Sequence, residues 1–436
     1  MSGWILAALM AGLAGGVKPA PAPAAQGGAA RTTIGGEVRV TADVLPRLDA
    51  VEARPEASLQ VARSAGRWRA AADVAVEALA ARRGEAGDGF TGAAIARVRD
   101  AWVEVTGRRG DLRAGFGTLP WGRLDEVQPS DVINPLDTTR FFLHGRRDAR
   151  LPVAFVRGRL FASDRMSVEG VLAPVFRRGV FDRLDEETSP FTLTRDAAAP
   201  PGVTLPSTRV HHESPRDSGA GLSGGGRLSM TVGRTDASLA IYRGFDAFGP
   251  IVLETNVLPG AGPVPVVVGR LVGLHPRFTM IAGDFETVRG AWGVRGEVAA
   301  FVEKTLAAPT ATGTTSGHVV EGGIGADRRW GGTTQLFVSV LVHREWSGEA
   351  PAVNRTDVNL VGSIERTFGR DRYRARMFGV ANPADGSAFL RALLAWSVRD
   401  DVAIDVSAGT FLGSGDDAIA RFDRRDFALL GVRFTY

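Results

Sequence analysis

Apolar and polar residues alternate along most of the chain after residue 35, in segments of about ten residues. The clearest segment spans residues 67–81. Its apolar positions are Trp68, Ala70, Ala72, Val74, Val76 and Ala78, and its charged positions are Arg67, Arg69, Asp73 and Glu77. Side chains of a strand alternate between two faces, so this pattern predicts strands with one apolar and one polar face. A charge facing lipid near mid-bilayer costs about 2–4 kcal/mol, so the charged face is expected to meet water.

About 18 such segments can be counted, with roughly 16 or roughly 20 as alternatives. They cover residues 37–44, 58–63, 67–81, 99–106, 111–118, 153–162, 166–176, 227–234, 237–245, 278–288, 291–303, 319–327, 333–346, 357–368, 372–380, 389–398, 402–411 and 426–436. Tight turns and longer polar connections alternate between them. The fold class predicted is all-β, a closed antiparallel transmembrane β-barrel. Tight turns in the periplasm make the long loops extracellular and leave both termini periplasmic.

The apolar segment 263–274 has two interpretations. It either folds inside the barrel or adds a strand, which would break the even number that a closed antiparallel barrel with both termini on one side needs. The segment 426–436 places Ala428, Leu430, Val432, Phe434 and Tyr436 on one face. A last strand ending in Phe-x-Tyr resembles the insertion signal of bacterial outer-membrane barrels. We therefore expect Phe434 and Tyr436 to act as the assembly signal, with the barrel-assembly machinery as a partner.

The N-terminal region predicts export to the outer membrane of a Gram-negative bacterium. Residues 1–25 have the length and small, apolar composition of a signal peptide, although no basic residue precedes Lys18. Residues 26–34 are expected to form a flexible leader, and residues 35–436 the barrel with its long extracellular loops. Beyond the N-terminus no run of about 18 apolar residues occurs, which excludes a helical membrane protein.

Composition narrows the chemistry further. The chain has 55 Gly and no Cys, so disulfides, thiolate catalysis and Cys-based zinc sites are excluded. The net charge of +4 comes almost wholly from scattered arginines that are matched by 48 acids, which argues against a nucleic-acid partner. Two places in the sequence bring a histidine near another polar or histidine side chain. His343 lies four residues from Ser339, roughly 13 Å along a strand and too far for a nucleophile–base pair. The run 211–213 offers adjacent histidines that point different ways. No enzyme activity, metal or cofactor is predicted.

The most distinctive sequence motif lies in the connection that follows the fifth segment. It reads Trp121-Gly-Arg-Leu-Asp-Glu-Val-Gln-Pro-Ser-Asp-Val-Ile-Asn-Pro-Leu-Asp-Thr-Thr-Arg140. A Trp-Gly … Asp-x-Ile-Asn-Pro-x-Asp run after a Gly-rich strand resembles a family of Gram-negative outer-membrane barrels known as a domain of unknown function (DUF thirteen-oh-two). That family is distantly similar to alginate-export-type porins. The resemblance implies an exported, porin-like barrel without a settled substrate, often associated with an inner-membrane exporter and with lipid or steroid metabolism.

Two interpretations of this connection, residues 119–150, stay open. In the first, Trp121 and Pro135 anchor a loop at the barrel rim, where Asn134-Pro135 makes a turn that Asp131 caps. In the second, the loop enters the lumen and forms a constriction. The residues that would line it are Asp125, Asp131, Asp137 and Arg140.

The function predicted is a porin-like channel for small polar or amphiphilic, including anionic, solutes. The alternative is a non-conducting, plugged barrel that serves envelope assembly or lipid export with an inner-membrane transporter. Alternation predicts these lumen-lining arginines: Arg67, Arg69, Arg157, Arg159, Arg295, Arg372, Arg374, Arg376 and Arg391. They either form a ladder that favours anions or pair with acids on neighbouring strands. Further partners expected are outer-membrane lipid and lipopolysaccharide.

Overall fold

The computed structural model describes most of the chain after residue 29. The described residues are 30–84, 89–125, 127–192, 194, 197, 199–215, 221–258, 266–308, 313–413, 417 and 419–436. The expected signal peptide and residues 26–29 of the expected leader lie outside them. Residues 31–34 of the predicted leader instead begin the first strand, where they pair with residues 61–64.

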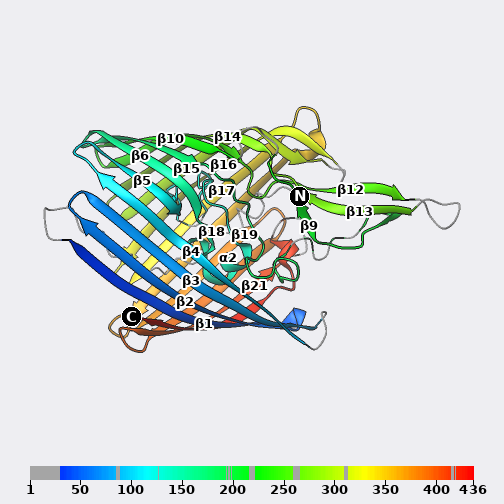
Figure 1. Cartoon of the computed structure of the whole chain (residues 1–436), viewed down its shortest axis with the longest axis horizontal. Coiled ribbons are helices and arrows are strands. Elements are labelled where there is room, and N and C mark those ends of the chain that lie inside the picture. Colours follow the sequence, from blue (N-terminus) through cyan, green and yellow to red (C-terminus); the bar gives the residue numbers. More distant parts are fainter. Residues whose placement is uncertain are drawn as a thin grey trace.

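The described chain forms one large sheet of 18 strands (Figure 1). The strands of this sheet are β1 (Arg31–Leu45), β2 (Ala50–Ala65), β3 (Trp68–Arg83), β4 (Phe90–Thr106), β5 (Gly110–Gly117), β6 (Val153–Ser163), β7 (Met166–Ala173), β10 (Ser223–Val232), β11 (Thr235–Phe245), β14 (Arg277–Arg289), β15 (Trp292–Ala307), β16 (Thr314–Trp330), β17 (Thr334–Trp346), β18 (Arg355–Phe368), β19 (Tyr373–Asn382), β20 (Ser387–Ser397), β21 (Val402–Leu412) and β22 (Phe427–Thr435). Short helices are η1 (Pro46–Leu48), α2 (Thr138–His144), α3 (Arg146–Ala149), η3 (Pro351–Val353) and η4 (Ala420–Phe422).

The sheet is closed and antiparallel, which confirms the predicted barrel and its strand number. Each strand pairs with the next, and β22 pairs with β1 through residues 428–435 and 37–44. Tyr436 extends this seam, because its backbone N–H and C=O bond with Gly36 at 3.1 and 3.0 Å. Closure therefore leaves no open edge in the barrel wall.

One end of the barrel carries short hairpin turns, and the other carries the long connections together with the short connections 46–49 and 383–386. Tight turns occur at residues 66–67, 233–234 and 290–291, and the long connections are residues 118–152, 174–222 and 246–276. The last strand ends at the short-turn end, on the left of Figure 1. Which end faces the cell exterior stays a prediction.

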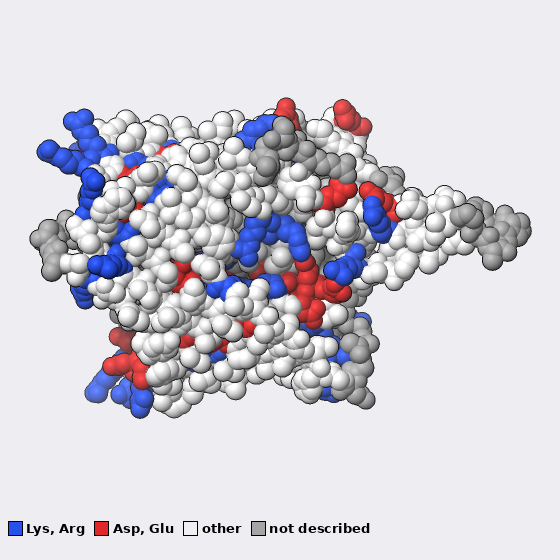
Figure 2. Space-filling view, in the orientation of Figure 1, with Lys and Arg blue, Asp and Glu red and all other residues white. Residues whose placement is uncertain are grey.

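The alternating residues of each strand lie on the outer face of the barrel and on its inner, lumen face. In β17, Val338, Val340 and Val342 are 46, 40 and 43% exposed on the outer face. The residues between them are buried against the lumen contents. Figure 2 shows wide uncharged areas on this side of the barrel, with Lys and Arg at the short-turn end and a further group of Lys, Arg, Asp and Glu from the middle of the view toward the long-connection end. Among the described residues, no helix is long and apolar enough to cross a membrane.

The segment 263–274 follows neither of its two interpretations. Residues Val266–Gly273 form β13, which pairs with β12 (Ile251–Leu258) and with the short strands β8 (Val203–Thr204) and β9 (Val210–His212). This second sheet projects away from the long-connection end of the barrel (Figure 1). The barrel therefore keeps its even strand number.

The lumen is filled at the long-connection end by chain from two connections. Helix α2 lies inside the barrel outline in Figure 1. Its Phe142 packs against Phe389 and Phe411 of the wall with ring centroids 5.8 and 5.3 Å apart, and against Phe191 of the second connection at 5.2 Å. A second apolar cluster joins Leu119, Trp121 and Ile133 to inward residues of β6, β7, β11 and β14–β16. The barrel interior is therefore a packed core over part of its height.

The closing strand can be tested through its aromatic end. Phe434 and Tyr436 lie on the outer face with ring centroids 6.1 Å apart, and the Tyr436 hydroxyl donates to Ser58 O at 3.1 Å. Deleting Tyr436 together with Phe434→Asp removes these seam contacts, and most chains should then fail to insert. The measurement is the amount of heat-modifiable barrel band in outer-membrane fractions, with Phe434→Leu as the matched control. A normal band in the double variant would show that the closing strand needs no aromatic end.

The orientation can be tested with two epitope tags. One tag is inserted at Gly202 in the second long connection, and the other in the hairpin turn at Gly369. Because long connections of outer-membrane barrels face outward, only the Gly202 tag should bind antibody on intact cells. Permeabilised cells, in which both tags should react, provide the control. Labelling of the Gly369 tag on intact cells would invert the orientation.

Candidate functional site: the charged lumen and its inserted loop

The first long connection, residues 118–152, is held to the inner wall by one carboxylate. Glu297, on the inner face of β15, accepts hydrogen bonds from the backbone N–H groups of Arg123, Leu124 and Ser130 at 2.8, 3.2 and 2.7 Å. The Ser130 hydroxyl also donates to it, at 2.7 Å. A single wall residue therefore satisfies four donors of the loop, which would otherwise be buried without partners.

The distinctive motif of this connection makes these contacts possible. Gly122 has φ +96°, and a Cβ there would lie 2.7 Å from the Glu297 carboxylate, so only glycine fits. The indole N–H of Trp121 donates to Glu169 on β7 at 2.9 Å. The Asn134 amide accepts from Leu119 N at 2.7 Å and donates to Leu151 O at 2.9 Å, which ties both ends of the loop together.

The acidic residues predicted for a constriction serve different purposes. Asp131 is buried between Arg146 and Arg150, at 3.0 and 2.7 Å. Burial alone would raise the pKa of the Asp131 carboxyl, but Arg150 and Arg146 hold that pKa below its ordinary value. Asp137 caps α2 by accepting from Arg140 N at 3.0 Å, and it also contacts Arg183 of the second connection at 2.8 Å.

Arg140 connects the helix to the opposite wall. Its guanidinium contacts Glu77 on β3 and lies 3.7 Å from Glu56 on β2. Asp131, Asp137 and Arg140 are all buried, so they brace the inserted loop rather than face open solvent. The second connection is braced in the same region, where Asp182 contacts Arg54 of β2 at 2.5 Å.

Asp125 is different, because its side chain is 40% exposed. It contacts Arg295 on β15, and Arg376 on β19 also acts on it electrostatically. Arg295 in turn contacts Glu286 and Asp327 on the neighbouring strands at 3.0 and 3.2 Å. The loop thus presents an acid to arginines of the wall at a place that water reaches.

The nine predicted lumen arginines fall into three groups. Four of them are ion-paired to acids on neighbouring strands or on the loop: Arg69, Arg157, Arg159 and Arg295. Two lie in exposed hairpin turns at the rim, because the alternation of a strand does not continue into a turn: Arg67 and Arg372. The remaining three lie on the inner faces of β19 and β20.

Arg391 on β20 is buried and donates to Phe142 O at 2.7 Å, so it holds α2 in place. Arg376 on β19 is buried opposite Glu365 of β18 in the strand register. Arg374 is half-buried, its register neighbours are the uncharged Thr367 and Ala395, and no acid among the described residues pairs with it.

The residues that hold the inserted loop, Glu297 and Glu77, lie on the barrel wall. The sequence did not predict that they contact the loop. Alternation of apolar and polar residues predicts that Glu297 and Glu77 lie on inner faces of their strands. It does not show which loop atoms meet them. Alternation also fails at Glu303, whose φ of +56° marks a bulge in β15 where the pairing with β16 shifts. Lys304 instead is buried and contacts Asp246 at 2.8 Å.

Two histidines form side-chain contacts with a neighbouring acid or histidine. His343 contacts Glu321 at 2.8 Å. In the small sheet, His212 lies 3.3 Å from His275, and burial together with Arg178 lowers the pKa of His212 to about 4. Within the described residues, no group of three or more His, Asp or Glu side chains is placed to hold a metal ion.

The fold resembles that of solved outer-membrane channels. The OccK7 (OpdD) structure of Pseudomonas aeruginosa has a TM-score of 0.50 at 8% sequence identity and covers 93% of this chain and 98% of that chain. The trimer form of OmpT of Vibrio cholerae has a TM-score of 0.45 at 10% identity, covering 94% and 100%. The channel DcaP of Acinetobacter baumannii has a TM-score of 0.44 at 9% identity, covering 94% and 98%.

These identities establish likeness of fold alone. A closed barrel of 18 strands with an apolar outer face defines the protein as an outer-membrane β-barrel. No protein-family model matches the chain, and no curated protein sequence does. Its resemblance to the family of unknown function therefore stays a prediction.

The Glu297 anchor gives a direct test of the loop. Glu297→Gln keeps the shape but replaces one acceptor oxygen by a donor, which leaves buried N–H groups unpaired at about 1–3 kcal/mol each. We expect a lower unfolding temperature and faster protease cleavage within residues 118–152. Glu104→Gln is the matched control, because this buried inward carboxylate on β4 pairs with Arg113 and Arg157 of the wall and contacts none of the loop's described residues. Equal cleavage rates in the two variants would show that Glu297 does not anchor the loop.

Proposed function

We propose that this protein is an outer-membrane channel for small solutes, with a modest preference for anions such as carboxylates. Its solute path runs past the exposed side of the inserted loop, along the inner faces of β14–β19. The proposal assigns no reaction to the barrel, since its charged lumen side chains brace the loop or face water.

The observation that carries the proposal is that several lumen charges near the short-turn end remain accessible to water. Toward the short-turn end, the side chains of Asp125, Glu286 and Arg159 are 40, 36 and 39% exposed. Toward the long-connection end, the side chains of Arg54 and Asp182 are both 0% exposed. Water therefore reaches charged side chains on the short-turn side of the inserted loop, and solutes would pass the loop beside these charges.

The anion preference rests on β19. Most wall arginines are neutralised by an acid on the next strand, so they contribute little net field. Arg374 has no such acid among the described residues, and it lies one inward position from Arg376. A low-dielectric wall focuses the field of an unpaired charge into the lumen. A guanidinium also binds carboxylate through two parallel hydrogen bonds.

A second candidate function is a plugged barrel that conducts nothing and serves envelope assembly or lipid export with an inner-membrane transporter. The observation in its favour is the packing of both connections, through Phe142, Phe191 and the Arg54–Asp182 pair, into one core with the wall. Purified protein in a planar bilayer separates the two, because a plugged barrel gives no single-channel steps.

The selectivity test uses the reversal potential across a KCl gradient. Wild type should favour chloride, and Arg374→Gln with Arg376→Gln should lower the chloride-to-potassium permeability ratio. We expect a change of roughly two- to three-fold, the effect of about one kT in local potential. Asp125→Asn should shift the ratio the other way, because it removes the acid that faces these arginines.

The matched control is Arg366→Gln. Arg366 is next to Glu365 on β18 and opposite Ala375, so it points out of the barrel at the height of the two tested arginines. Its loss should leave the permeability ratio unchanged. A cation-selective wild type, or equal ratios in the double variant and wild type, would overturn the anion preference while leaving the channel itself intact.

A further inference from the structure

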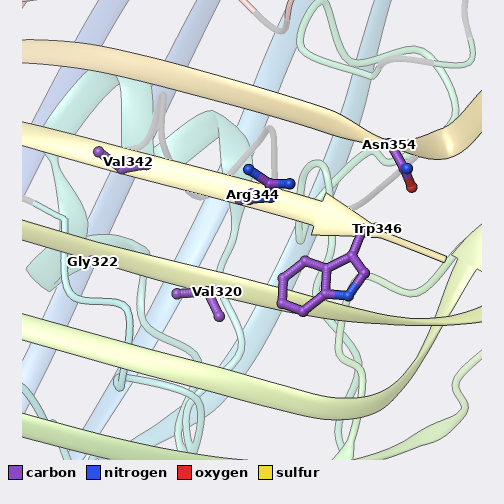
Figure 3. Close-up of a pocket in the computed structure, with 6 residues that line it drawn as sticks. All are labelled: Val320, Gly322, Val342, Arg344, Trp346 and Asn354. Carbon is purple, nitrogen blue, oxygen red and sulfur yellow. The ribbon is translucent and has the colours of Figure 1, made fainter. Parts of the chain in front are cut away.

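The lipid-facing side of β17 ends in an arginine. Its outer face runs Val338, Val340, Val342, Arg344 and Trp346, and Figure 3 shows Arg344 between Val342 and Trp346 on this strand. Arg344 is exposed, and its register neighbours on β16 and β18 are Val320 and Thr356. Because Trp residues of membrane barrels lie at headgroup level, Arg344 is at the upper edge of the apolar band.

This guanidinium has no counter-charge within the protein. Among the described residues, no acid, hydrogen-bond acceptor or aromatic ring contacts the Arg344 side chain. An arginine that borders the hydrocarbon layer is stabilised when an anion neutralises it there. The groups available at that depth, outside the barrel, are the headgroups of membrane lipids.

A hollow surrounds the arginine. It has a volume of about 510 Å³ and is lined by Val320, Gly322, Val342, Arg344, Trp346 and Asn354 (Figure 3). The Asn354 amide oxygen accepts from Ser347 N at 3.0 Å, whereas its amide nitrogen has no partner in the described part of the chain. The hollow thus combines an apolar floor with two free sets of N–H donors, which suits a phosphate attached to an apolar group.

An apolar groove continues from this hollow down the outer wall. It has a volume of about 660 Å³ and spans β15 to β20. The two features meet on adjacent strands, because the register pair Gly322–Val342 of the hollow is followed by Ile324–Val340 of the groove. Gly362 and Gly379 lie opposite each other in its floor, and their missing side chains make the depression that an acyl chain can fill.

We propose that this surface is a binding site for lipopolysaccharide. A phosphate of its lipid A headgroup contacts Arg344 and Asn354, and one of its acyl chains lies in the groove over Gly362 and Gly379. The long-connection end, where Arg344 lies, faces outward in barrels of this type, and lipopolysaccharide is the multiply acylated, phosphate-bearing lipid of that leaflet. Two observations support this assignment. The positive charge of Arg344 is complementary to a phosphate, and an apolar groove continues from the hollow below it.

The test measures lipid binding to delipidated full-length protein by native mass spectrometry. The probes are lipid A, dephosphorylated lipid A, phosphatidylglycerol and phosphatidylcholine. Wild type should bind lipid A most tightly. Arg344→Gln should weaken that binding by at least about ten-fold, the loss expected for one charge-assisted contact, and Arg344→Lys should restore part of it.

A second variant tests the groove without changing any charge. A Cβ on Gly362 would meet only Phe337 O, at an ordinary 3.7 Å, so Gly362→Leu fits the wall and fills the groove. It should weaken lipid A binding while leaving the heat-modifiable band in place. Arg234→Gln, the same charge change in an exposed turn at the other end of the barrel, should have no effect.

The outcomes separate the possible occupants. Equal binding of lipid A by wild type and Arg344→Gln would overturn the site. Equal binding of phosphatidylglycerol and lipid A would assign the hollow to an ordinary phospholipid instead. A lipid-free oligomer that Gly362→Leu dissociates would show that a second copy of the chain covers the groove. Channel conductance is independent of all three results.

Discussion

Backbone hydrogen bonding in a membrane is the constraint on which this structure depends. No water in the hydrocarbon layer can satisfy an exposed N–H or C=O group, so a sheet that crosses it must close on itself. Here the closing contact is the pairing of β22 with β1, which Tyr436 extends through its backbone bonds to Gly36. Closure fixes the even strand number and forces every strand to show one face to lipid and one to the lumen.

The enclosed lumen has to be filled by protein or by water. In this barrel, part of it is filled by the two connections, and part of its charged surface is accessible to water. Apolar inward residues receive α2 and the second connection, so that Phe142 contacts aromatic rings from β20, β21 and residue 191. Inward acids bind polar groups of the same connections. Glu297 accepts hydrogen bonds from the loop backbone, and Glu77 contacts Arg140. Because a buried acid needs donors and a buried loop needs acceptors, each satisfies the other.

This arrangement relates the fold to the proposed function. A loop fixed by Glu297 at one end and by Arg140 at the other is a rigid object inside the barrel. Its Asp125, 40% exposed, is held against Arg295. In the proposed channel, selectivity would depend on the few charges without an acid partner among the described residues, such as Arg374, rather than on the larger number of ion pairs in the wall.

The amino-acid sequence alone predicted the barrel, a strand number of about 18 with roughly 16 or roughly 20 left open, and the inward side of most strands, because alternation with a period of two is local and repeats in every strand. It also identified the loop motif, since glycine, proline and acidic residues at fixed spacings constrain the nearby backbone. It did not determine that Gly122 needs to be glycine because of Glu297, or that Arg391 binds Phe142 O, because these contacts join residues far apart in the chain. Only the tertiary structure decided which inward arginines find an acid, which connection enters the lumen and that residues 266–273 form a separate sheet. Such choices depend on how neighbouring strands and distant loops meet in space, and no local pattern encodes that.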